Sequence, residues 1–270
     1  LFPLKNRARE GGRRLFRRPS GPAWAFAVKD VRCFFRDQTQ WPQLFLVAAL
    51  IAIYLYNFSV LPFGQARIRP IYLQNLFSFL NMGLAAFVLT AIAARFVYPA
   101  VSCEGEAFWI IRAAPLSLRT FLWVKFAVYC LPLLVLAEIL IVCSNVLLGV
   151  TPAMMGISVV TVFAMVPGVV ALGVGLGAAY PDFRSENPTQ AVTSFGGLLF
   201  MLLAAGFIAL VIVLEAGPVY ALFMANLAGR PLAGWQRAWL AASFTFALLL
   251  CALAVILPMR FGERRLRENW

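Results

Sequence analysis

The sequence predicts an all-α integral membrane protein with six transmembrane helices. Of its 270 residues, 62% are apolar and only 13% are charged, and the mean hydropathy is +0.84. An average globular domain is about 45 to 50% apolar and about 25% charged, so the excess apolar side chains must face hydrocarbon. Backbone groups in lipid must be hydrogen-bonded within their own segment or a closed barrel, and long uncharged runs therefore indicate helices.

Six apolar runs reach the length of about 20 residues that is needed to cross about 30 Å of hydrocarbon. The predicted transmembrane domain covers 41–260, with spans at about 42–61, 76–97, 122–148, 153–180, 191–214 and 238–259. Another apolar run, 216–229, is too short to span and contains Pro218. We expect it to form a re-entrant or interfacial helix between spans five and six.

The distribution of basic residues orients these spans. With the N-terminus in the cytosol, 19 of the 23 Lys and Arg residues fall on the cytosolic side and 4 on the outer side. Cytosolic segments of membrane proteins are enriched in Lys and Arg, so both termini are predicted to be cytosolic. This asymmetry also explains the net charge of +12 without nucleic acid as a partner.

Both ends of the chain are basic. Residues 1–21 contain no apolar signal-peptide core, which indicates a cytosolic linker or a cut end that contacts anionic membrane lipid. Residues 22–40 place apolar side chains on one helical face and cations on another, which predicts an amphipathic helix lying in the inner membrane interface. Residues 261–270 form a basic cytosolic tail.

The segment after span two predicts a short cytosolic helix. Pro99 ends the span, Ser102 can cap the new helix, and Pro115 stops it. The helix places three apolar side chains at a loop tip that would ordinarily be polar, namely Phe108, Trp109 and Ile111. Two interpretations are open: a helix folded onto the membrane surface with Trp109 as its anchor, or a knob that binds a cytosolic partner.

The sequence lacks the residues that several kinds of catalytic and binding site require. The sequence has no His, its five Cys residues form no CxxC, and no GxxxxGK[ST] phosphate-binding loop occurs. His-based catalysis, His metal sites and a P-loop are therefore excluded. We expect no catalytic, metal or cofactor site in this chain.

Residues 99–125, PAVSCEGEAFWIIRAAPLSLRTFLWVK, closely resemble the first intracellular segment of permease subunits of bacterial ATP-binding-cassette (ABC) exporters of the type-two family. Their pattern is P-x-x-S-x-E-G-x-x-F-W-x-x-R-x-[AS]-P-L-S, followed by a Lys at the start of the next span. Residues 29–44 and 180–190 are similar to that family's pre-span helix and to its segment between spans four and five. The resemblance covers most of the chain.

The resemblance implies a permease subunit, not itself an enzyme, that moves substrate across the bacterial inner membrane. An ABC ATPase subunit would bind ATP and Mg²⁺ and dock on a coupling helix. The implied ATPase contacts are Glu104, Gly105, Glu106, Phe108, Trp109, Arg112 and Pro115. The implied second cytosolic contact comprises Asp182, Phe183, Arg184, Glu186 and Asn187.

Larger members of that family carry two six-span halves. A start without Met and a linker-like first segment indicate the C-terminal half of such a permease, whereas a half that homodimerises is the alternative. Two other functions are open: a secondary transporter with Glu138 as its proton-coupling site, and a non-transporting membrane anchor.

Polar and flexible residues within the predicted spans form the last group of candidates. Glu138 should face the bundle interior, protonated or paired, with Ser144 and Asn145 near the same face. Three roles are open for Glu138: an interhelical hydrogen bond, a place on a substrate path or dimer interface, and proton coupling. In span four, Pro167 permits a kink, and Gly173 and Gly177 permit close helix packing.

Overall fold

The computed structural model describes residues 21–38, 41–60, 70–114, 116–183, 192–229 and 233–269. All regular elements in these ranges are helical. They are α1 (Pro22–Arg36), α2 (Trp41–Ser59), α3 (Pro70–Phe96), the 3₁₀ helices η2 (Tyr98–Ala100) and η3 (Ser102–Ala107), α4 (Phe108–Ala113), α5 (Leu118–Leu148), α6 (Pro152–Ala179), α8 (Phe195–Ala228) and α9 (Gly234–Asn269).

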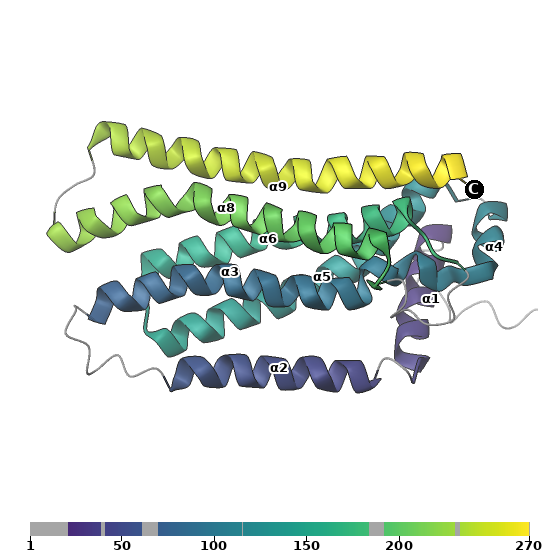
Figure 1. The fold of residues 1–270 in the computed structure, drawn as a ribbon, viewed down its shortest axis with the longest axis horizontal. Helices are drawn as coiled ribbons and strands as arrows, with labels where there is room; N and C mark the ends of the chain where they lie inside the picture. Colours follow the sequence, from purple (N-terminus) through teal and green to yellow (C-terminus); the bar gives the residue numbers. More distant parts are fainter. Residues whose placement is uncertain are drawn as a thin grey trace, which may run out of the picture.

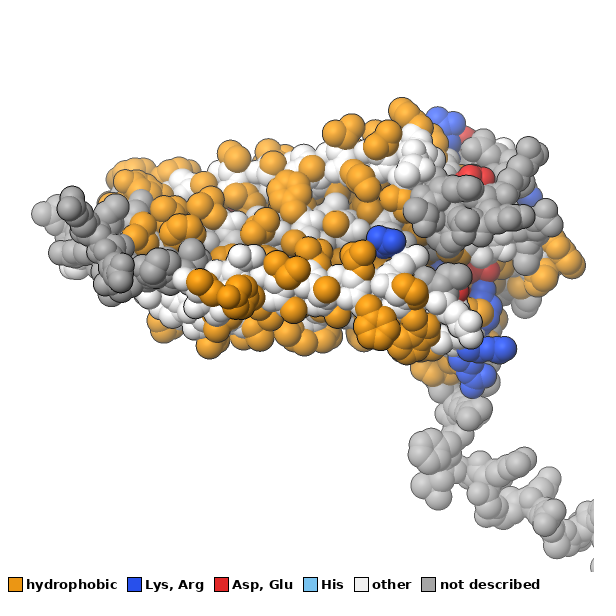
Figure 2. Space-filling model, turned by 60° about the horizontal axis from the view of Figure 1, so that its bottom comes forward, with side chains coloured by type: hydrophobic (Ala, Val, Ile, Leu, Met, Phe, Trp, Pro, Cys, Tyr) orange, Lys and Arg blue, Asp and Glu red, His pale blue; other side chains and the backbone are white. Residues whose placement is uncertain are grey.

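Six of these helices are long and apolar enough to cross a membrane, which confirms the predicted number of spans. They are α2, α3, α5, α6, α8 and α9, and they run lengthwise through one elongated bundle (Figure 1). On the face shown in Figure 2, hydrophobic side chains cover most of this bundle. A surface of that kind is expected for a protein surrounded by lipid.

The helix α6 lies at the centre of the bundle and α2 at its margin. The core of α6 packs against α3, α5, α8 and most extensively against α9. By contrast, only Val47 and Tyr54 of α2 are buried, and Figure 1 shows α2 set apart from the other spans. Most of α2 is therefore available to lipid or to another protein.

Small residues on α6 allow its close packing. A Cβ atom at Gly177 would overlap the carbonyl oxygen of Tyr98, and one at Gly175 would overlap that of Pro258 on α9. At Gly173 it would lie 3.0 Å from Val97 Cγ1. Helix backbones approach this closely only where a side chain is missing.

The prediction of a separate helix over 216–229 is wrong, because α8 continues through Pro218 to Ala228. Proline cannot donate to the carbonyl four residues before it, which here belongs to Leu214. The Ser243 hydroxyl of α9 donates to that oxygen over 2.5 Å. A neighbouring hydroxyl thus replaces the missing bond, which is how spanning helices tolerate proline.

One end of the bundle collects the non-spanning elements. Figure 1 shows α1, α4 and the C-terminus at this end, with α1 lying across the bundle axis. Most of the Lys, Arg, Asp and Glu side chains visible in Figure 2 gather there. We call it the charged end, comprising α1, η3, α4, the first turns of α5 and the last turns of α9. The helix predicted over 22–40 is present as α1, ending at Arg36.

Candidate docking site at the charged end

Four charged side chains form a cluster that joins α1, η3 and α5. The Lys125 ammonium lies 2.9 Å from Asp30 Oδ2 and 2.5 Å from Glu104 Oε1. Lys29 Nζ lies 2.7 Å from Glu104 Oε2 and 3.3 Å from Asp30 Oδ1. Two positive and two negative charges therefore balance at the point where the three elements meet.

The cluster is buried on one side and open on the other. The side chains of Lys125, Asp30 and Glu104 are 4%, 5% and 10% exposed, whereas that of Lys29 is 42% exposed. The Phe26 ring covers both ammonium groups, with its centroid 4.2 Å from Lys29 Nζ and 5.2 Å from Lys125 Nζ. Buried charges are tolerated when they are paired in this way, so the cluster fixes η3 against α1 and α5.

The chain turns sharply between η3 and α4 at Gly105. This residue has φ +54° and ψ −145°, a conformation that residues with a side chain rarely adopt. Glu104, directly before the turn, is held by two lysines, so the turn reorients the chain from a fixed point into α4. Gly105 therefore sets the direction of α4 and does not itself offer a side chain to a partner.

The structure corrects the predicted exposure of the α4 knob. Phe108 is only 4% exposed and stacks on Phe183, with ring centroids 4.8 Å apart and planes at 20°. It also meets the edge of Phe121 on α5, and Ile111 is buried too. These aromatic contacts come from residues far apart in the sequence, so helical spacing alone could not reveal them.

The exposed part of α4 is a different apolar pair. Trp109 is 68% exposed and Ile110 is 54% exposed. Arg112 of the same helix is exposed beside them. Two large apolar side chains on a helix that is anchored through Phe108 form a rigid surface of the kind that partners bind.

The two segments predicted to face a partner are joined in the structure. Ser102 does not cap η3; its hydroxyl oxygen accepts a hydrogen bond from the backbone N–H of Asp182 over 3.1 Å. Phe183 lies under α4 through its stack with Phe108. Of the remaining predicted contacts, the Glu106 side chain and the residues Pro115, Arg184, Glu186 and Asn187 lie outside the described part of the chain.

A second group of polar side chains lies between spanning helices toward the opposite end. Ser78 Oγ donates to Asn145 Oδ1 and Asn81 Nδ2 donates to Ser144 Oγ, both over 2.7 Å. The Tyr54 hydroxyl bonds Asn81 Oδ1. These residues come from α2, α3 and α5, so the network connects the peripheral helix α2 to the bundle.

Glu138 takes no part in that network. Its side chain is half-buried, and its Oε1 atom has no hydrogen-bond partner among the described residues. Ser144 and Asn145 find their hydrogen-bond partners in the polar part of α3, which contains Ser78 and Asn81. Among the described residues, the Oε1 atom of Glu138 therefore forms no interhelical hydrogen bond.

The buried intramembrane acid is instead Glu215, which was not among the predicted site residues. It is 2% exposed on α8, and both carboxylate oxygens accept from the Thr161 hydroxyl of α6, over 3.1 and 2.9 Å. The sequence does contain a feature that could have identified it: Glu215 is a single acid between two apolar runs, and these runs form one helix. Ending span five at residue 214 and starting a separate helix at 216 put Glu215 at a predicted junction.

A family model described as "Putative ATP-binding cassette" matches residues 7–269. The chain belongs to this family. The match covers nearly the whole chain and includes the charged end and all six candidate spans. No curated protein and no solved structure matched the sequence.

This match corrects two expectations. The description names an ATP-binding cassette, typically an ATPase, and not a permease, so the assignments as an exporter permease and as a chain without an enzymatic role are both overturned. The segments quoted for the resemblance are 29–44, 99–125 and 180–190, whereas the family model spans 7–269. The description itself names no nucleotide-binding residue, and the sequence contains no GxxxxGK[ST] loop.

The coarser conclusions hold. The chain is related to ABC transporters, and the family implies association with other ABC transporter components. The six long apolar helices are consistent with a membrane protein.

Proposed function

We propose that this chain is a membrane-embedded component of an ABC transporter and that its charged end contacts the nucleotide-binding ATPase component. The observation that carries this proposal is the exposed pair Trp109 and Ile110 on α4. Their helix is anchored by the Phe108–Phe183 stack, and the segment before it by the buried ion cluster, so the surface is preorganised. Preorganised aromatic surfaces lose little entropy on binding.

In this proposal the charged end faces the cytosol, and the membrane is the bacterial inner membrane. The excess of Lys and Arg at this end supports that orientation. A cytosolic partner could reach Trp109, Ile110 and Arg112 without entering the lipid. Movement of α4 by the partner would pass to α5 through the Phe108–Phe121 contact and to α1 through Glu104.

Site-specific photocrosslinking in the native membrane tests the contact. A photoreactive phenylalanine analogue at position 109 should give an adduct with a P-loop protein, identified by mass spectrometry. Position 235 is the matched control, because Trp235 is 67% exposed in the first turn of α9, and this helix begins at the opposite end of the bundle (Figure 1). Lipid adducts alone at position 109 would place α4 on the membrane surface and contradict the proposal.

Two further measurements separate contact from folding and from intrinsic activity. The double variant Trp109→Ala/Ile110→Ala should leave abundance unchanged but reduce co-purification of the P-loop protein, since each hot-spot side chain contributes about 2 kcal/mol or more. Phe108→Ala should instead lower abundance, because that ring is buried. ATP turnover by the purified chain alone is the activity that the family description implies, and finding it would replace the proposal with an ATPase role for this chain.

A further inference from the structure

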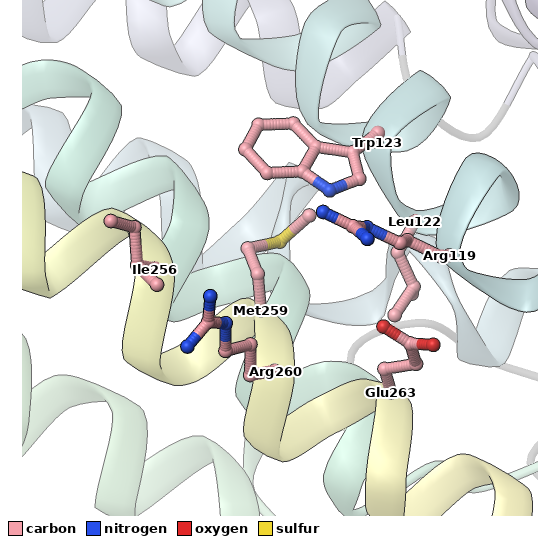
Figure 3. A pocket seen from close by; sticks show the side chains of 7 residues that line it. All are labelled: Arg119, Leu122, Trp123, Ile256, Met259, Arg260 and Glu263. Atoms are coloured by element: carbon pink, nitrogen blue, oxygen red, sulfur yellow. The ribbon is translucent and has the colours of Figure 1, made fainter.

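A small pocket lies between α5 and α9 at the charged end. It has a volume of about 300 Å³ and is lined by Arg119, Leu122 and Trp123 from α5 and by Ile256, Met259, Arg260 and Glu263 from α9. Figure 3 shows the guanidinium groups of Arg119 and Arg260 reaching into the same space from the two helices, with Met259 between them. The pocket therefore brings two cations together over an apolar floor.

The charge of this pocket favours an anion. Within the described part of the chain, neither Arg119 nor Arg260 forms an ion pair. The one carboxylate in the lining, Glu263, is paired with Arg267 over 3.1 Å. Two guanidinium groups without carboxylate partners can both donate charge-assisted hydrogen bonds to one phosphate group.

The pocket lies at the boundary between the apolar stretches of the spans and the charged end. Arg260 directly follows the last apolar stretch of α9, and Arg119 lies in the first turn of α5. Trp123 is 39% exposed beside them, and tryptophan is enriched at the boundary between hydrocarbon and headgroups. The two arginines thus lie where the phosphates of the adjacent leaflet would be.

An apolar groove continues from the pocket along α5. It has a volume of about 760 Å³, and its lining includes Trp24 and Val31 from α1 and Val124 and Leu131 from α5. Trp123 lines both the pocket and the groove. From Trp123 to Leu131 the helix rises about 12 Å, close to the depth of about 15 Å of one hydrocarbon leaflet.

We propose that the pocket and the groove together bind one anionic glycerophospholipid of the leaflet at the charged end. The phosphate would lie between Arg119 and Arg260, and an acyl chain would pass Trp123 into the groove between α1 and α5. The lipid would thereby connect α9 to α5 and α1, which the ion pair of Lys125 with Asp30 already joins to each other. The site is separate from the exposed pair on α4 and does not depend on the ATPase contact.

Native mass spectrometry of the purified full chain tests this site. The probes are dioleoyl phosphatidylglycerol and dioleoyl phosphatidylcholine, added in equal amounts to the protein in detergent. We expect the wild type to retain one phosphatidylglycerol with about a tenfold preference, and Arg119→Gln/Arg260→Gln to lose that preference. Tenfold corresponds to about 1.4 kcal/mol, a modest value for two charge-assisted contacts.

The matched control is Arg264→Gln/Arg265→Gln. It removes the same number of positive charges from the charged end, but both residues are exposed and neither lines the pocket or the groove. Its lipid preference should equal that of the wild type. Equal loss in both double variants, or equal retention of the two lipids by the wild type, would overturn the proposal.

A third variant tests the acyl-chain part and keeps the proposal falsifiable if the arginine variant does not fold. Ala127→Trp fills the groove without changing charge, since Ala127 is exposed in its lining. It should lower phosphatidylglycerol retention about tenfold. Unchanged retention would show that the lipid binds without an acyl chain in this groove, and would contradict the proposal that pocket and groove form one site.

Discussion

Lys125 illustrates how one residue determines the geometry of the charged end. It is almost completely buried, and it contacts carboxylates from two different elements, Asp30 of α1 and Glu104 of η3. Without its charge, the two buried carboxylates would share only the partly exposed ammonium of Lys29. The side chain is therefore required for both α1 and η3 to keep their positions.

Replacing Lys125 with Met should lower the free energy of unfolding by about 3 to 5 kcal/mol, the usual cost of breaking a buried ion pair. Lys29→Met is the matched control in the same cluster, and since that side chain is 42% exposed, its loss should cost about 1 kcal/mol or less. Titration with SDS in mixed micelles measures both. Equal losses would show that solvent reaches the whole cluster.

Thr161 gives a second prediction at the residue scale. Its hydroxyl donates to both oxygens of the buried Glu215, so Thr161→Val should destabilise the bundle by about 1 kcal/mol, as interhelical hydrogen bonds in membranes do. The same substitution at Thr245 is the control. That hydroxyl is exposed and bonds only Ala241 in its own helix, so no measurable loss of unfolding free energy is expected there.

Among the elements, α8 depends most on a neighbour. Pro218 leaves the Leu214 carbonyl without its helical donor, and Ser243 of α9 supplies one. Ser243→Ala should therefore cost about 1 kcal/mol in the wild type. In a Pro218→Ala background the backbone bond can form again, and the same change should cost almost nothing.

This double-mutant cycle identifies the interaction by its non-additivity. The comparison needs four unfolding titrations: wild type, each single variant and the double variant. Additive losses would mean that Ser243 stabilises α9 for another reason. In that case the Ser243 hydroxyl would not be what allows α8 to continue beyond Pro218.

The elements differ in how far the sequence predicts them. Uncharged runs predict the six spans because lipid leaves a long apolar segment no other structure. Hydropathy could not show that α8 is continuous, because the compensating hydroxyl lies on the next helix. Likewise the cluster of Lys29, Asp30, Glu104 and Lys125 joins residues up to 96 positions apart, and no local pattern encodes such contacts.

For the whole molecule, the bundle separates apolar and charged surfaces along its long axis. The spans expose large apolar side chains along their length, and charged side chains gather at one end (Figure 2). The sequence predicts this separation from the positions of Lys and Arg alone. It does not predict which aromatic side chains at the charged end are free, because Phe108 is buried by a segment 75 positions away and Trp109 is not.

The orientation of this axis is the last prediction. With the native cysteines replaced by Ala, single cysteines at 233 and 265 would report opposite ends, because Ala233 precedes α9 and Arg265 lies in its last turns. Both positions are exposed, so accessibility differs only through the membrane. Since 19 of 23 basic residues belong to the segments predicted to be cytosolic, an impermeant thiol reagent on intact cells should label 233 and spare 265 until the membrane is opened. Labelling of 265 on intact cells would show that the orientation is the reverse of the predicted one. Trp109 would then lie on the side away from any cytosolic ATPase.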